Sequence, residues 1–244
     1  MTSLEEIRGQ EINVVKMYFI PGTRVLEIGG GNGFQASLLV ALGADVKSID
    51  VAQPAGQHTF FPVEIYDGHT IPYSNAAFDV VFSSNVLEHV QHIDAMMTEV
   101  SRVLKADGVA IHILPTSSWR FWTSLTHYVY LAMRVLGQRR PVRGGLVPSL
   151  GEKVQRSGLC DTANRILLAG PHGEYPSALS ELWYFSRSRW LEVFRKNNFN
   201  ATRSTPSGIF YTGYSVMPSL SIGARQKLAK IFGSSTHIYV LRKT

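Results

Sequence analysis

A glycine-rich loop after a short apolar strand constrains the fold of this chain more than any other feature. Residues 25–28 are apolar except for Glu27, and they predict a buried parallel strand. Three glycines follow at alternate positions: Gly29, Gly31 and Gly33. They let the backbone turn tightly and approach a ligand where a Cβ would clash. Since residues 34–42 then predict a helix, the segment is typical of a nucleotide-type pocket, in which N–H groups at the helix start meet the ligand.

A carboxylate follows this loop at the distance that a ribose-binding residue needs. Residues 44–50 predict a second strand that ends in Asp50. Asp50 comes about 20 residues after the first glycine, where a carboxylate can accept hydrogen bonds from both ribose hydroxyls. A nicotinamide-binding protein has a similar spacing, and a solvated strand end is the alternative for Asp50. The register of Asp50 with the glycines favours a nucleoside ligand without identifying it.

Strands and helices alternate along most of the chain. Further strands are predicted at residues 61–66, 79–83, 109–114, 200–204 and 237–242. Further helices are predicted at residues 3–19, 93–104, 188–197 and 221–232. This alternation predicts an α/β fold of the Rossmann-like, doubly wound kind, with a mostly parallel sheet covered on both faces. A chain of 244 residues can bury one large core, so we expect a single domain over residues 1–244.

Three further segments complete an order of motifs that is more specific than any of its parts. They are residues 66–73, which begin with Tyr66-Asp67-Gly68, residues 78–90, which include Ser84-Asn85-Val86-Leu87-Glu88-His89, and Arg102-Val103-Leu104-Lys105-Ala106-Asp107-Gly108. With the glycine loop, this order resembles the class I S-adenosylmethionine-dependent methyltransferases, in particular the group with an E-x-G-x-G-x-G loop and a Leu-Glu-His turn. The resemblance covers roughly residues 20–115. It implies a seven-stranded sheet with an antiparallel final strand, and S-adenosylmethionine as cofactor.

The resemblance also assigns roles to individual residues. The methionine part of the cofactor would be surrounded by Glu27, Gly29, Gly31 and Gly33, and the ribose would be bound by Asp50. Asp67 and Gly68 would flank the adenine, although an Asp-Gly pair is also ordinary turn chemistry. Ser84 and Asn85 would lie near the reactive end of the cofactor. For Glu88 and His89 we expect structural support at the start of the following helix, where a carboxylate is favourable, ahead of catalysis.

Residues 115–185 break the alternation and predict an inserted, partly helical cap after the fifth strand. Apolar side chains recur there at helical spacing: Trp119, Trp122, Leu125, Val129, Met133 and Leu136. Polar side chains occupy the other face: Arg120, Ser124, His127, Arg134 and Gln138. This pattern predicts an amphipathic helix. Three interpretations stay open: a helix packed on its own core, a lid over a substrate pocket, and a membrane contact through residues 119–143, which hold no acidic residue.

The expected chemistry is direct transfer of a methyl group from the sulfonium to a nucleophile. A hydroxyl acceptor would need a general base. His172, in the polar segment 170–175 of the insertion, is the first candidate, and a surface histidine is its alternative. His127 is the second candidate, whereas His112 is expected to be a satisfied histidine in a buried strand. Because Cys160 is the single cysteine, a cysteine metal cluster is excluded, and we expect no metal site.

We therefore expect an S-adenosylmethionine-dependent methyltransferase that acts on a small or lipid-linked acceptor, with a hydroxyl of a sugar or another cell-envelope intermediate preferred. The alternatives are a methyltransferase of a quinone, lipid or secondary metabolite, and a nucleoside-binding protein of the same fold without catalysis. An NAD-dependent dehydrogenase is disfavoured because it would make the later motifs coincidences.

The net charge of +6 comes with no base-reading module, so no nucleic acid is expected as partner. The start of the chain lacks a signal-peptide pattern, so we expect a cytoplasmic protein, in contact with the inner face of the membrane if residues 119–143 bind lipid.

Overall fold

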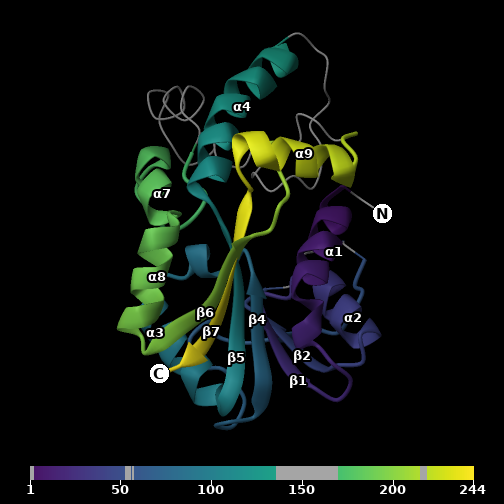
Figure 1. Ribbon diagram of the computed structural model, residues 1–244, viewed down its shortest axis with the longest axis vertical. Coiled ribbons are helices and arrows are strands. Elements are labelled where there is room, and N and C mark those ends of the chain that lie inside the picture. Colours follow the sequence, from purple (N-terminus) through teal and green to yellow (C-terminus); the bar gives the residue numbers. More distant parts are fainter. Residues whose placement is uncertain (1–2, 53–55, 57, 136–169, 215–218) are drawn as a thin grey trace.

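A seven-stranded sheet forms the centre of the molecule (Figure 1). The computed structural model describes residues 3–52, 56, 58–135, 170–214 and 219–244. The strands are β1 Arg24–Ile28, β2 Asp45–Asp50, β3 Glu64–Ile65, β4 Phe78–Ser84, β5 Leu104–Pro115, β6 Phe199–Pro206 and β7 Thr236–Lys243. Their order is β3-β2-β1-β4-β5-β7-β6, with β1 to β5 parallel and β7 antiparallel to both of its neighbours. The predicted Rossmann-like sheet and its antiparallel last strand are confirmed.

Helices cover both faces of this sheet, as the alternation predicted (Figure 1). The helices and 3-10 turns are α1 Ser3–Val15, η1 Lys16–Tyr18, α2 Phe34–Ala41, η2 Leu87–His89, α3 Ile93–Val103, α4 Ser117–Val135, α7 Ala178–Tyr184, α8 Arg187–Lys196 and α9 Ile222–Phe232. α1 and α2 pack on one face, and α3 and α8 pack on the other. α4, α7 and α9 lie beyond the end of the sheet at which the parallel strands finish (Figure 1). That end of the sheet is therefore covered by the insertion and by the last helix.

Alternation of side chains along the strands divides the core into two layers. In β4, Val80 and Phe82 belong to the layer under α1 and α2, whereas Val81 belongs to the layer under α3 and α8. The central strands are buried on both faces, which is why they appear in the sequence as nearly continuous apolar runs. β3 is shorter than the predicted strand at 61–66, because only Glu64 and Ile65 pair with the end of β2.

The first helix of the insertion turns a polar face inward, which corrects the predicted packing of α4. Arg120, Thr123 and His127 are buried, whereas Leu125 and Val129 of the predicted apolar stripe are 49% and 45% exposed. The buried polar groups have partners, since an unpaired polar group in the interior is costly. Residues 136–169, with Leu136 and Gln138, lie outside the described part of the chain. Among the described residues, no helix combines the length and the hydropathy needed to cross a bilayer.

Candidate active site

A cavity of about 480 Å³ lies at the carboxyl ends of the central parallel strands. β1 contributes Ile28 and Gly29, β2 contributes Asp50, and the loop after β4 contributes Asn85 and Val86. β1 lies between β2 and β4, so the strand order reverses at this point, and α/β sheets bind ligands in such a crevice. The volume is also in the range of roughly 300–1,000 Å³ that is typical of pockets for cofactors and small molecules.

The glycine loop forms one wall of this cavity, and its glycines have different roles. Gly29, Gly31 and Gly33 have φ values of +78°, +56° and +78°, a region that favours glycine. A Cβ on Gly29 would overlap the side chain of Val86, and a Cβ on Gly33 would overlap the backbone of Phe61. A Cβ on Gly31 would meet nothing within 4 Å. Gly29 thus lines the cavity, and Gly33 fits the start of α2 against Phe61. At Gly31 only the positive φ favours glycine, and its N–H is bonded to Asp50.

Asp50 lies at the end of β2 with its carboxylate facing the loop. Its Oδ2 accepts the N–H of Gly31 at 2.8 Å, and its Oδ1 accepts the N–H of Val51 at 2.7 Å. A carboxylate offers about four lone-pair sites, so both oxygens retain the capacity to accept a further hydrogen bond. Because Asp50 also lines the cavity, its geometry fits the predicted binding of two ribose hydroxyls.

Glu27 lies behind the loop and does not line the cavity. The Oγ of Ser48 donates a hydrogen bond to its Oε2 at 2.6 Å, and a Cβ on Gly30 would come against both side chains. Burial raises the pKa of Glu27 to about 7. The carboxylate is therefore part of a buried network that supports the loop, and a contact of Glu27 with the methionine part of the cofactor stays a prediction.

The predicted adenine site contains Gly68 and Tyr66, an aromatic residue of the same motif to which no role was assigned. Gly68 lines the cavity together with Tyr66 and His69. Asp67 is exposed beside them, outside that lining, and its Oδ1 accepts the N–H groups of Thr70 and His69 at 2.7 Å each. These two hydrogen bonds lower the pKa of Asp67. The Asp67 carboxylate thus shapes the turn that presents Gly68 to the cavity.

The turn after β4 is held by an arginine from the first helix, a contact that no sequence pattern predicted. Asn85 lines the cavity with a φ of +56°, and with its amide oxygen toward Arg8 it accepts a hydrogen bond at 2.5 Å. Nη1 of Arg8 also donates to the Oγ of Ser84 at 3.2 Å. Glu11 holds the same guanidinium at 2.7 Å, so α1 fixes the end of β4.

Glu88, His89 and His172 form a polar cluster beside the cavity. Oε1 of Glu88 lies 3.8 Å from Nε2 of His89 and 3.9 Å from Nε2 of His172. His89 also lines the cavity. Burial raises the pKa of Glu88 to about 8 and lowers the pKa of His172 to about 3. The expected place of Glu88 and His89 at the start of the next helix is wrong, because they belong to the separate turn η2, and α3 begins at Ile93.

His172 is held in this cluster through its backbone. Oε1 of Glu181 accepts the N–H groups of His172 and Gly173 at 2.6 Å each. Oε2 of Glu181 lies 3.1 Å from Nε of Arg120, so a buried ion pair from α4 and α7 anchors the loop. The sequence singled out His172 from the polar, glycine-flanked character of its segment, but it contained no signal for the buried Glu181.

The other two histidines considered in the sequence lie elsewhere. His127 is buried on α4, and its Nδ1 lies 2.7 Å from the hydroxyl of Tyr214. It follows Arg120 by two turns, about 10 Å along the helix axis, so its role as a base stays a prediction. His112 is buried in β5 as expected, with Nδ1 2.8 Å from the Oγ of Ser83, but its Nε2 has no hydrogen-bond partner in the described chain, so only one ring nitrogen is satisfied.

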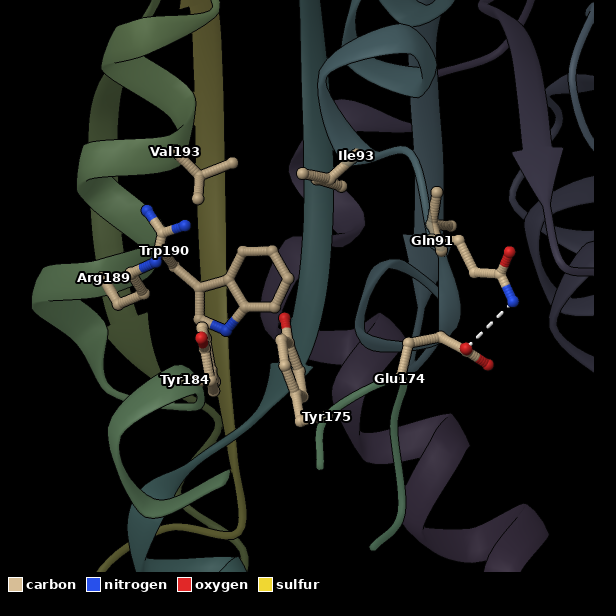
Figure 2. A pocket seen from close by; sticks show the side chains of 9 residues that line it. Gln91, Ile93, Glu174, Tyr175, Tyr184, Arg189, Trp190 and Val193 are labelled. Atoms are coloured by element: carbon tan, nitrogen blue, oxygen red, sulfur yellow. Dashed lines mark hydrogen bonds between the residues drawn. The ribbon is translucent and has the colours of Figure 1, made fainter. Parts of the chain in front are cut away.

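A second, smaller cavity of about 200 Å³ adjoins the first (Figure 2). Val90 and Gln91 line both cavities. Figure 2 shows the aromatic side chains that line the second cavity: Tyr175, Tyr184 and Trp190. The rings of Tyr175 and Tyr184 stack with centroids 4.1 Å apart. Nε2 of Gln91 donates to Glu174 at 3.1 Å, which ties the insertion to the loop after η2 (Figure 2).

Comparisons with known proteins agree on the type of domain. A family model described as a methyltransferase domain matches residues 9–204. The chain is 30% identical over 148 residues to the biotin biosynthesis bifunctional protein BioHC of Cellvibrio japonicus, covering 56% of this chain and 28% of that protein. It is 32% identical over 91 residues to the demethylmenaquinone methyltransferase of Corynebacterium efficiens, covering 36% of this chain and 40% of that protein. The chain therefore spans less than half the length of these curated relatives.

A solved structure shows the same fold. The 1,6-didemethyltoxoflavin-N1-methyltransferase of Burkholderia thailandensis, with bound 1,6-didemethyltoxoflavin and S-adenosylhomocysteine, is similar with a TM-score of 0.56. The match covers 98% of this chain and 79% of that chain, at 13% sequence identity. At this identity the likeness concerns the arrangement of helices and strands and not the choice of acceptor.

Proposed function

This chain belongs to the methyltransferase-domain family, and from this premise we propose that it is an S-adenosylmethionine-dependent methyltransferase that methylates a hydroxyl group of a small acceptor. The observation that carries the proposal is the Glu88–His89–His172 cluster, which borders the cofactor cavity and is covered by the loop of the insertion. A hydroxyl nucleophile needs a group that handles its proton, and this cluster consists of such groups.

The cofactor would occupy the larger cavity. When bound, S-adenosylmethionine supplies an electrophilic methyl group on its sulfonium. Asp50 would accept hydrogen bonds from the ribose, Gly29 would allow close approach of the backbone, and Gly68 with Tyr66 would enclose the base. These assignments rest on the cavity lining and on the free acceptor capacity of Asp50. Alignment of the acceptor and exclusion of water can then supply much of the rate acceleration.

The acceptor hydroxyl would lie at the border of the cofactor cavity that His89 lines, in line with the methyl group and within reach of the Glu88–His89–His172 cluster. The lowered pKa of His172 keeps its imidazole neutral, so a ring nitrogen can accept a hydrogen bond from the acceptor hydroxyl and orient its oxygen. The loop that carries His172 is fixed by Glu181 and by the hydrogen bond of Gln91 to Glu174. A fixed loop at this place supports the exclusion of water from the reacting groups.

The adjoining aromatic cavity supports a ring-shaped acceptor. Tyr175, Tyr184 and Trp190 offer flat apolar faces against which a ring can pack, and Arg189 adds a positive charge at the edge. A sugar ring with an anionic substituent is our preferred acceptor. A quinone-type ring is the second candidate, since it fits the same aromatic faces and one relative is a demethylmenaquinone methyltransferase.

A lipid-linked form of the acceptor is supported by apolar side chains around the insertion. Large exposed hydrophobic residues gather on α4 and α7: Phe121, Leu125, Tyr128, Val129, Leu179 and Trp183. Such side chains suit the contact of an interfacial helix with a membrane surface. Sedimentation with anionic liposomes at low and at physiological salt tests this contact, and a protein that stays in the supernatant at both salts would contradict it.

Calorimetric titration with S-adenosylmethionine, S-adenosylhomocysteine and NAD in parallel is the first test. We expect binding of the first two ligands alone. The second step is an assay of S-adenosylhomocysteine release with hydroxylated sugar nucleotides, lipid-linked sugars and reduced quinones as acceptors. Turnover with the sugars would support the preferred acceptor, turnover with quinols alone would replace it, and binding of NAD alone would overturn the site assignment.

A further inference from the structure

Glu88 is a buried carboxyl group that lies among other charged side chains. Three carboxylates and two guanidinium groups interact at this place: Glu11, Glu88, Glu181, Arg8 and Arg120. Arg8 pairs with Glu11 at 2.7 Å, and Arg120 pairs with Glu181 at 3.1 Å. Within the described chain, no other residue donates a hydrogen bond to either oxygen of Glu88, which is 1% exposed. A buried carboxylate without such partners is costly unless a cation or a proton accompanies it.

The two imidazoles beside Glu88 complete a set of metal ligands. One oxygen of Glu88 and one ring nitrogen each of His89 and His172 all lie within 4.8 Å of one another. Ligands at about 2.0–2.2 Å from a zinc ion in tetrahedral geometry lie roughly 3.4 Å apart. The separations of 3.8 and 3.9 Å from Glu88 to the imidazoles are therefore close to those of a bound site. Because the His89 side chain is 42% exposed, it can rotate to shorten them.

The chemistry of these groups favours a transition-metal dication over Ca²⁺ or Mg²⁺. Two imidazoles with one carboxylate suit Zn²⁺ and Fe²⁺, whereas Ca²⁺ and Mg²⁺ prefer oxygen ligands alone. His172 and Gly173 are also fixed by Glu181, so little order would have to be created on binding.

We propose that Glu88, His89 and His172 bind a divalent transition-metal ion, with Zn²⁺ as the representative case, beside the cofactor cavity. Three protein ligands leave a coordination position open, as in catalytic zinc sites, and His89 places it next to the cavity. The role of this position rests on the proposed function: an acceptor oxygen bound there would have a lowered hydroxyl pKa. Its proton could then leave to water, and His172 would act as a ligand and not as a base.

Metal binding to the untagged full chain tests the site without any assay of activity. The protein is dialysed against EDTA and then against metal-free buffer, and Zn²⁺ binding is measured by equilibrium dialysis with elemental analysis. We expect a single tightly bound Zn²⁺ ion per chain. His89→Ala, His172→Ala and Glu88→Gln should each weaken it by about 100-fold or more, since each removes a direct ligand. Glu88→Gln keeps the shape of the side chain and removes a buried charge, so it should fold.

His58→Ala is the matched control, because His58 is an exposed histidine outside both cavities. It should leave Zn²⁺ binding unchanged. Co²⁺ as a second probe should show the absorption of a nitrogen- and oxygen-ligated ion in the wild type and lose it in His172→Ala. No stoichiometric Zn²⁺ in the wild type, or equal binding by the wild type and Glu88→Gln, would overturn the inference.

Titration of the same samples with S-adenosylhomocysteine separates this inference from the proposed function. Binding of S-adenosylhomocysteine without Zn²⁺ would overturn the metal site alone. Binding of Zn²⁺ without S-adenosylhomocysteine would support the metal site and contradict the cofactor assignment. If both bind, chelation should abolish methyl transfer and Zn²⁺ should restore it, whereas activity that survives chelation would show that His172 and Glu88 act without a metal.

Discussion

The backbone N–H of Glu174 donates a hydrogen bond to the carbonyl oxygen of Glu88 at 3.1 Å. This bond joins the last part of the insertion to the turn that follows β4. Gly173, the residue before Glu174, lies so close to Glu88 that a Cβ on it would overlap the same carbonyl oxygen. Glu181 fixes the loop from the other side. The loop that carries His172 and the turn η2 are therefore packed as one unit, and the Glu88–His89–His172 cluster is formed from both.

Gly173→Ala should disturb this unit. The added methyl group has no room against the Glu88 carbonyl, so we expect a loss of about 1–3 kcal/mol in the free energy of unfolding, measured with urea. Gly170→Ala, in the same loop, is the control, because a Cβ there would meet nothing within 4 Å. It should stay within about 1 kcal/mol of the wild type. Equal stability of the two variants would show that the contact of Gly173 with Glu88 is not formed.

Glu181→Gln should lower the free energy of unfolding by more than Gly173→Ala does. It leaves the buried guanidinium of Arg120 without its carboxylate, and breaking a buried ion pair on one side costs about 3–5 kcal/mol. Combining it with Arg120→Met should cost less than the sum of the single changes, because the pair is then removed as a whole. Glu192→Gln, in an exposed pair with Arg189 at 3.5 Å, should change stability by less than about 1 kcal/mol. Additive effects in the double variant would contradict the coupling.

Much of the fold was predictable because its signals are local. The first strand is a short, mostly apolar run before a glycine at residues 25–28, and the second, at residues 44–50, alternates polar and apolar residues up to an acid; their positions along the chain were confirmed. β3 was overestimated because its ends are set by pairing with β2 at the sheet edge, which leaves no pattern in the sequence. The inward polar face of α4 was missed because the partner of Arg120 is Glu181, far along the chain.

The candidate site likewise contains residues that could be predicted from the sequence and residues that could not. The resemblance named Gly29, Asp50, Gly68 and Asn85, and the structure brings these four to one cavity. The groups that the sequence did not connect come from distant segments. Arg8 reaches the end of β4 from the first helix, and the cluster of Glu88 with His172 forms only when the insertion folds back. A single sequence carries no record of such contacts, since each residue type is ordinary at its own position.

Asp50→Ala should weaken cofactor binding. Loss of the carboxylate removes two acceptors from the cavity and leaves the N–H of Gly31 without its partner, so the affinity for S-adenosylhomocysteine should fall by about 1–3 kcal/mol, or roughly 5- to 150-fold. Asp45→Ala is the matched control at the exposed start of the same strand, where Asp45 lies 3.9 Å from Arg24. Calorimetry should find its affinity unchanged. Wild-type affinity in Asp50→Ala would remove the ribose assignment.

Glu27 should make the stability of the fold depend on pH. Its pKa is raised by burial from 4.5 to about 7, so the folded state holds the proton more tightly than the unfolded chain. The contribution of Glu27 is therefore fully present below about pH 4.5 and is lost as the pH rises through 7. At about 1.4 kcal/mol per pKa unit, the free energy of unfolding of the wild type should fall by roughly 3 kcal/mol between about pH 5 and pH 8 relative to that of Glu27→Gln, which has no proton to lose at this position. Urea unfolding across this range measures the difference. Glu64→Gln, on the exposed strand β3, should show no such difference, and parallel curves for Glu27→Gln and the wild type would mean that Glu27 stays ionised in the folded protein.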